Sequence, residues 1–242
     1  MTWQIVSAQS SGMRHEQQDD GGAWTSRDGK SVLAVIADGA GGHHGGRQAA
    51  LTAVATARKL WKNVPPTSKD ARDFLEKISR SAHEAVAKEA RSERSSRTTW
   101  VALLAFENEA HWVHSGDSRL YHFSSGKLSS RTVDHSLIQA LLEQGKVTEA
   151  QIRTHPDRAI LLQSLGGPHY APVESGFAKI GRDDLFILCT DGVFGDINED
   201  ELRQLAVATR NQRTQLVKDL VQMAVKRGGK RADNATLWCI FR

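Results

Sequence analysis

Cysteine is scarce in this 242-residue sequence, which contains only Cys189 and Cys239, far apart and each within an apolar run. The sequence contains no Cys-x-x-Cys pair, and this excludes a disulfide framework and a cysteine-rich zinc module. We expect both thiols to be buried as small apolar side chains in a reducing compartment.

Long hydrophobic runs and a strong excess of one charge are also missing. Segments such as WVALLAF (100–106) are far shorter than the roughly 20 residues of a membrane-spanning helix, and the N-terminal region has no signal-peptide core. The net charge is only +4, and the densest basic patch, RGGKR (227–231), is too short to indicate nucleic-acid binding. We therefore expect a cytoplasmic protein with no membrane span and no nucleic-acid partner.

Short β-type runs dominate what is present, in a composition ordinary for a globular protein. Runs rich in Val, Ile, Leu, Trp and Phe predict strands at 3–8, 31–37, 98–106, 110–115, 119–123, 184–190 and 235–241. The segments SGDS (115–118) and SSGK (124–127) look like hairpin turns. Much of the sheet structure is therefore predicted to be antiparallel.

Apolar stripes with helical period predict three long helices, over 46–61, 70–91 and 213–227, the last ended by Gly228 and Gly229. A shorter helix is predicted from a cap at Asp134 to Gly145. The order is not a regular βαβ alternation, so it predicts an α+β domain with amphipathic helices covering antiparallel sheets. The proline-rich segment 63–70 is expected to join two helices.

The glycine-rich segment VLAVIADGAGGHHGG (32–46) allows three interpretations. A dinucleotide cradle is disfavoured because GAGGHH (39–44) lacks the final glycine of G-x-G-x-x-G, and Asp38 would repel a pyrophosphate. A zinc site is disfavoured because His43 and His44 are adjacent, and the histidines of HWVH (111–114) lie on opposite faces of a strand. The third interpretation is a site for a harder metal.

Four aspartates at the ends of predicted strands favour the harder metal: Asp38, Asp117, Asp191 and Asp233. A single aspartate at a strand end is commonly a turn residue. Four that converged would repel one another unless cations lay between them. Oxygen ligands favour Mg²⁺ or Mn²⁺ over zinc, and Gly39 would let a backbone carbonyl approach an ion. The pattern alone does not establish that the aspartates meet.

Seven segments then occur in order over nearly the whole chain: RHEQQD (14–19), ADGAGGHHGG (37–46), SGDSRLY (115–121), TVDHSLIQALLEQGKVT (132–148), THPDRAILLQSLGG (154–167), DDLFILCTDGVFGDI (183–197) and ADNATL (232–237). Together they resemble the motifs of the PPM/PP2C family of metal-dependent protein serine/threonine phosphatases. The resemblance implies one catalytic domain over residues 1–242. It also implies a four-layer α-β-β-α sandwich, in which two packed antiparallel sheets are flanked by helix pairs.

The same resemblance implies a site for two to three Mn²⁺ or Mg²⁺ ions at one edge of the sandwich. Asp38 would bridge two ions and the Gly39 carbonyl would bind one of them. Asp191 and Asp233 would complete this pair of sites, and Asp117 would join Asp191 in binding a third ion.

Three further residues would complete the implied catalytic set. Asp19 would orient metal-bound waters, and Arg14 would hold the substrate phosphate through its planar guanidinium. A water activated by the metals would attack phosphorus, and His43 would protonate the leaving oxygen. His44 is an alternative to His43. Gln18 stands where many relatives carry Glu, so one water-mediated contact to a metal loses a charge.

The implied activity is hydrolysis of phosphoserine and phosphothreonine in a protein substrate. A monomer that opposes a cognate bacterial Ser/Thr kinase is expected, with control of type VI secretion as one setting. The alternative, from a different functional class, is a catalytically silent phosphoprotein-binding module on the same fold. Because every metal-ligand aspartate is present, the sequence favours the enzyme.

Overall fold

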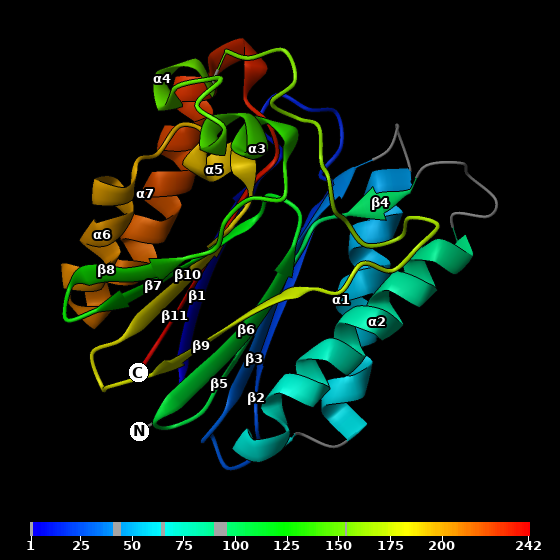
Figure 1. The fold of residues 1–242 in the computed structure, drawn as a ribbon. Helices are drawn as coiled ribbons and strands as arrows, with labels where there is room; N and C mark the ends of the chain where they lie inside the picture. The colour runs from blue at the N-terminus through cyan, green and yellow to red at the C-terminus, as the bar shows by residue number, and fades with distance from the viewer. Residues whose placement is uncertain (1, 41–44, 64–65, 90–95, 153) are drawn as a thin grey trace.

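Two antiparallel β-sheets, packed face to face, form the centre of the computed structural model, which describes residues 2–40, 45–63, 66–89, 96–152 and 154–242 (Figure 1). The five-stranded sheet has the order β1 (Gln4–Ser10), β11 (Ala235–Phe241), β10 (Leu185–Cys189), β7 (Arg119–Ser124) and β8 (Lys127–Arg131). The six-stranded sheet has the order β2 (Asp19–Thr25), β3 (Val32–Ala40), β5 (Trp100–Ala105), β6 (Glu109–Ser115) and β9 (Glu174–Lys179), with β4 (Arg97–Thr98) paired to β3.

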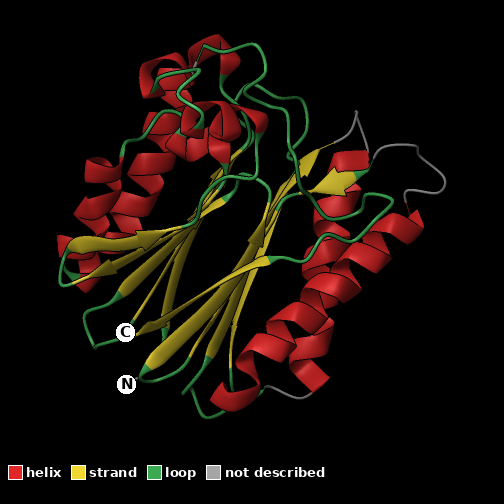
Figure 2. Cartoon of the chain, viewed as in Figure 1, coloured by secondary structure: helices red, strands yellow, loops and turns green. Residues whose placement is uncertain are grey.

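Helices cover the outer face of each sheet (Figure 2). The six-stranded sheet is covered by α1 (Gly45–Asn63) and α2 (Ala71–Glu89), joined through η1 (Ser68–Asp70). The five-stranded sheet is covered by α5 (Asp191–Phe194), α6 (Glu199–Val207) and α7 (Arg210–Gly228), with η2 (Gly229–Arg231) after α7. The short helices α3 (Leu137–Glu143) and α4 (Glu149–Ile152) lie beyond one end of the sheets. The predicted four-layer sandwich is therefore confirmed.

The apolar residues of β3 show why the strands can be continuously hydrophobic. Leu33 and Val35 pack in the cluster beneath α1 and α2, whereas Ala34 and Ile36 pack between the two sheets. Both faces of the strand are thus buried, which accounts for a run of apolar residues in place of an apolar–polar alternation. The predicted helical stripes also face the core, and Cys189 and Cys239 are buried as expected.

One of the two predicted hairpin turns is correct. Ser125 and Gly126 have left-handed backbone angles (φ 50° and 73°) and join β7 to β8, as a two-residue hairpin turn requires. The SGDS segment was wrongly expected to be a hairpin. It connects β6 of one sheet to β7 of the other, so Asp117 lies in a crossover between the two sheets.

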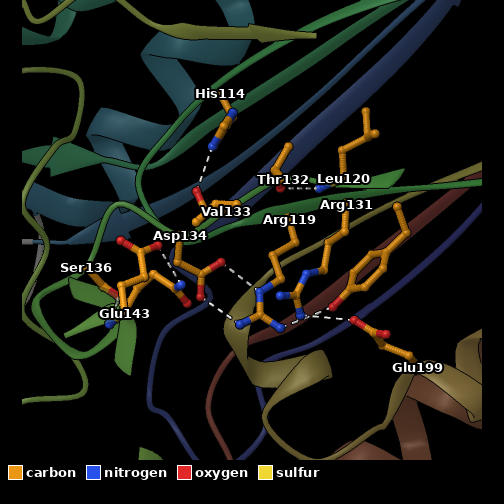
Figure 3. A network of polar contacts seen from close by, with 12 residues as sticks. His114, Arg119, Leu120, Arg131, Thr132, Val133, Asp134, Ser136, Glu143 and Glu199 are labelled. Carbon is orange, nitrogen blue, oxygen red and sulfur yellow. Dashed lines mark hydrogen bonds and ion pairs between the residues drawn. The ribbon is translucent and has the colours of Figure 1, made fainter. Parts of the chain in front are cut away.

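The predicted cap at Asp134 is also wrong. Helix α3 begins after Ser136, whose side chain accepts a hydrogen bond from the Gln139 N–H. The Asp134 carboxylate binds the Arg119 guanidinium instead, with two contacts of 2.7 Å (Figure 3). This two-pronged ion pair joins β7 to the segment before α3. None of the helices in the described ranges is both long enough and apolar enough to cross a membrane.

Candidate metal centre

The five aspartates of the predicted site lie together where strands of both sheets end. Asp38 is the register partner of Asp19, the first residue of β2. Asp191 begins α5 directly after β10, Asp117 lies between β6 and β7, and Asp233 lies just before β11. The negative charges of the other four all raise the pKa of Asp38, so the structure brings these carboxylates into one electrostatic cluster.

Threonine side chains fix the backbone of Asp38. The Asp38 N–H donates to Thr99 Oγ1 (2.8 Å), while the hydroxyl of Thr98 donates to the Asp38 carbonyl (2.9 Å). Thr99 Oγ1 also shares a hydrogen bond of 2.7 Å with Ser118 Oγ, in the crossover that carries Asp117. The positions of Asp38 and Asp117 are therefore linked through buried hydroxyl groups.

Asp19 is buried beneath the cluster and is held by two hydroxyl groups. Thr190 and Thr236 donate to its Oδ2 at 2.9 Å and 2.7 Å. Its Oδ1 is also buried and accepts no hydrogen bond from the described residues. An acceptor left in this way at a buried carboxylate is costly unless a water or an ion satisfies it.

Burial is the largest cause of the raised pKa values in the cluster, and neighbouring carboxylates raise them further, whereas the Thr190 and Thr236 hydroxyls lower the pKa of Asp19. The resulting pKa is about 6 for Asp191, about 7 for Asp19 and about 8 for Asp117. The pKa of Asp38 is raised well above its usual value, first by burial and then by the charge of Asp19. Without cations, the cluster therefore retains protons near neutral pH.

Gly39 lies where the backbones of two segments approach closely. A side chain at this position would collide with the carbonyl oxygens of Gly46, in the first turn of α1, and of Gln18. The Gly39 N–H donates to the Gln18 carbonyl at 3.1 Å. The glycine is thus required by the contact between β3, the start of α1 and the segment before β2.

Arg14 contacts the cluster through Asp233, with Nη2 2.6 Å from the carboxylate Oδ2. Asn234, next in sequence, anchors the loop that carries Arg14. Its amide donates to the carbonyls of Ser11 and Glu16, both at 3.0 Å, and its Oδ1 accepts the Gln18 N–H at 2.7 Å. The loop therefore holds the positively charged Arg14 guanidinium directly beside the carboxylates.

The remaining predicted residues are less informative. His43 and its alternative His44 lie outside the described residues. The Gln18 side chain donates to Glu16 at 3.4 Å, and its role at a metal remains a prediction. The sequence alone gave no role to Asn234, Thr99, Thr190 or Thr236. Thr190 lies in the segment 183–197, and Asn234 and Thr236 lie in the segment ADNATL (232–237), both of which carry the family resemblance.

The donor set fits hard divalent cations. It consists of carboxylate oxygens from the five aspartates and the backbone carbonyl of Gly39, and Mg²⁺ and Mn²⁺ prefer such oxygen ligands. The mutual repulsion within the cluster and the unsatisfied Oδ1 of Asp19 are features that bound cations and their waters would relieve. The residues present therefore fit a metal centre.

The chain is similar to known protein phosphatases. The family model for protein phosphatase 2C matches residues 9–232. The serine/threonine phosphatase Stp of Listeria innocua is 29% identical over 203 residues, covering 82% of this chain and 80% of that protein.

Solved structures share the fold. PppA, described as a key regulatory component of T6SS in Pseudomonas aeruginosa, is similar with a TM-score of 0.83 and 26% identity, over 100% of this chain and 98% of that one. The catalytic domain of the phosphatase PstP, solved with two manganese ions, matches with a TM-score of 0.83 and 23% identity, over 99% and 97% of the two chains. This last likeness shows the fold alone.

Proposed function

Because the chain belongs to the protein phosphatase 2C family, we propose that it hydrolyses the phosphate esters of phosphoserine and phosphothreonine in proteins. It is an enzyme of the metal-dependent phosphoprotein phosphatase class. We further propose that residues 1–242 act as one catalytic unit. The observation that carries the proposal is the convergence of five aspartates from both sheets.

In this proposal, the ions are Mn²⁺ or Mg²⁺ and number two or three. Asp38, Asp191, Asp233 and the Gly39 carbonyl hold two of them, and Asp117 with Asp191 holds the third. Asp19 orients waters from below, through the carboxylate oxygen that no described residue satisfies. When bound, such ions lower the pKa of water toward neutrality and offset the charge of a phosphoryl group.

Arg14 is proposed to bind the substrate phosphate. Its side chain is 61% exposed and lies 2.6 Å from Asp233, at the rim of the cluster. A cation held by Asp233 would compete with Arg14 for that carboxylate, which would release the guanidinium to grip two phosphoryl oxygens. The proposed proton donor to the leaving oxygen is His43, because a serine or threonine alkoxide needs a proton to leave.

A further part of the proposal concerns the biological process in which the protein acts. We propose that the protein opposes a Ser/Thr kinase and acts on that kinase's protein substrates. PppA, its 26% identical structural relative, is described as a regulator of T6SS, and this supports a similar setting here. The support is analogy between relatives.

The proposal is tested by hydrolysis of a phosphothreonine peptide in Mn²⁺, Mg²⁺, Ca²⁺ and EDTA. We expect turnover with Mn²⁺ or Mg²⁺, none in EDTA and almost none for Asp191→Asn. Asp200→Asn is the matched control, since this aspartate has a side chain 90% exposed on α6. No turnover in any metal, from folded protein, would contradict the proposal and favour a silent phosphoprotein-binding module.

A further inference from the structure

A second group of ligand-type side chains lies outside the aspartate cluster. His114 on β6 and Glu174 on β9 are direct partners across neighbouring strands, and His135 comes from the segment before α3. One nitrogen or oxygen of each residue lies within 4.8 Å of those of the other two. Three separate segments therefore present two imidazoles and a carboxylate to one place.

His114 offers a buried nitrogen that has no partner. Its Nε2 lies 2.8 Å from the Val133 carbonyl, and a carbonyl only accepts, so this nitrogen carries the proton (Figure 3). Its Nδ1 is buried and has no hydrogen-bond partner among the described residues. Burial lowers the pKa of His114, which favours the neutral ring. The Nδ1 lone pair is thus available to a cation.

His135 and Glu174 complete the group on its solvent side. The two imidazole rings stack with centroids 4.5 Å apart and 17° between their planes. His135 Nε2 lies 3.2 Å from Glu174 Oε2, and its Nδ1 accepts only a long contact of 3.3 Å from the Gly116 N–H. The Glu174 side chain is 57% exposed, so an ion can enter from solvent.

We propose that His114, His135 and Glu174 bind one Zn²⁺-type ion at a site separate from the aspartate centre. Two imidazoles and one carboxylate form a ligand set that suits zinc, with a fourth position left for water. The all-oxygen aspartate centre suits harder ions. The proposal does not depend on the proposed phosphatase activity.

Binding requires a small rearrangement. Lone pairs of stacked rings point along nearly parallel planes, so the His135 ring turns out of the stack to share an ion with His114. If His135 binds through Nε2, a bond to the ion replaces its contact with Glu174 Oε2. The backbone N–H of His135 donates to the backbone carbonyl of Gly116 at 2.9 Å, and Gly116 precedes Asp117. Occupancy would therefore act on the crossover that carries Asp117.

The experiment is calorimetric titration of Zn²⁺ into the full chain at saturating Mg²⁺, which occupies the aspartate centre. The variants are His135→Ala and Glu174→Gln. His111→Ala is the matched control, because His111 also lies on β6 and contacts a single carboxylate, Glu109, at 3.3 Å. We expect His135→Ala to bind one Zn²⁺ fewer than the wild type. In Glu174→Gln the affinity of this site for Zn²⁺ should fall by roughly tenfold or more. His111→Ala should bind Zn²⁺ as the wild type does.

A second measurement locates the ion without a variant. In Zn²⁺-treated crystals of the wild-type chain, the anomalous signal at the zinc edge should peak between His114 and Glu174. Equal zinc stoichiometry and affinity in the wild type and His135→Ala, or anomalous peaks only at the aspartates, would overturn the proposal.

Discussion

Asp19 and Asp38 face each other as register partners on β2 and β3. Like charges directly opposite each other on neighbouring antiparallel strands destabilise a sheet. After burial, the charge of Asp19 is the largest cause of the raised pKa of Asp38. The fold thus places two carboxyl groups that repel each other when both are ionised at the place where the ions are proposed to bind.

The stability of the metal-free protein should consequently fall as pH rises from about 5 to about 8. Asp191, Asp19 and Asp117 have pKa values of about 6, 7 and 8 in the fold, above the value of about 3.9 in an unfolded chain. The folded state therefore binds more protons than the unfolded state across this window, and the free energy of unfolding decreases with pH. Urea unfolding in EDTA at several pH values measures this free energy of unfolding.

The contribution of one carboxylate is isolated by comparing the wild type with Asp117→Asn. His114 and His83, whose pKa values are lowered, act in the opposite direction in both proteins and cancel in the difference. We expect the variant to lose less stability than the wild type as pH rises, and excess Mg²⁺ to flatten the wild-type curve. Parallel curves in EDTA would show that Asp117 does not retain its proton.

Replacing Asn234 with alanine should impair substrate binding through the Arg14 loop. Its side chain makes three hydrogen bonds, to Ser11, Glu16 and Gln18. Losing them leaves partly buried backbone groups without these partners, at a cost of about 2 kcal/mol in the free energy of unfolding. We expect a raised KM for a phosphopeptide in addition to this loss of stability, measured by steady-state kinetics and urea unfolding.

Asn198→Ala is the control for that prediction. Asn198 caps α6 by accepting the Glu201 N–H at 2.9 Å, and α6 packs on the far side of the five-stranded sheet. Its loss should cost about 1 kcal/mol of stability and leave KM unchanged. If both variants changed KM equally, the effect would reflect general destabilisation and not the position of Arg14.

Arg14→Ala should lower kcat/KM by about 10- to 100-fold, because charge-assisted hydrogen bonds contribute about 1.5–3 kcal/mol. Arg14→Lys should restore only part of this, since an ammonium cannot bind two phosphoryl oxygens in one plane. Arg131→Ala is the matched control, because Arg131 pairs with Glu199 at 2.9 Å on the edge strand β8. Kinetic constants equal to wild type in Arg14→Ala would remove Arg14 from the site.

His43→Ala tests the proposed proton donor. Alkyl phosphates need a proton on the leaving oxygen, whereas the p-nitrophenolate of p-nitrophenyl phosphate leaves with little help. We expect a large loss of rate for the first substrate and little loss for the second. Equal losses for both substrates would exclude the acid role, and His44→Ala in parallel distinguishes the two adjacent histidines.

The three long helices, α3 and most of the inner strands were predictable because their apolar patterns are strong, whereas α4, α5 and α6 were missed. β2 was missed because its sequence, DDGGAWT, combines two aspartates and two glycines, which are rare in strands. Gly21 is needed there, since a side chain would collide with the Trp238 ring of the opposite sheet. β9 was missed because it is an exposed edge strand containing a glycine.

The ends of the strands identified the carboxylates, but no local pattern identified the groups that position them. Thr190 and Thr236 contact Asp19 from 171 and 217 residues away in the sequence. Such contacts depend on how the two sheets pack, which a single sequence does not display. The same limit explains why zinc was set aside at HWVH. His114 meets His135 and Glu174 only in the folded chain.

The most direct test of the central claim is a calorimetric titration of Mn²⁺ into EDTA-treated, dialysed protein, wild type against Asp38→Asn. If the aspartates form the metal centre, the wild type should bind two to three ions and the variant should lose at least the two ions that Asp38 is proposed to hold. Equal stoichiometry and affinity in the two proteins would contradict the account.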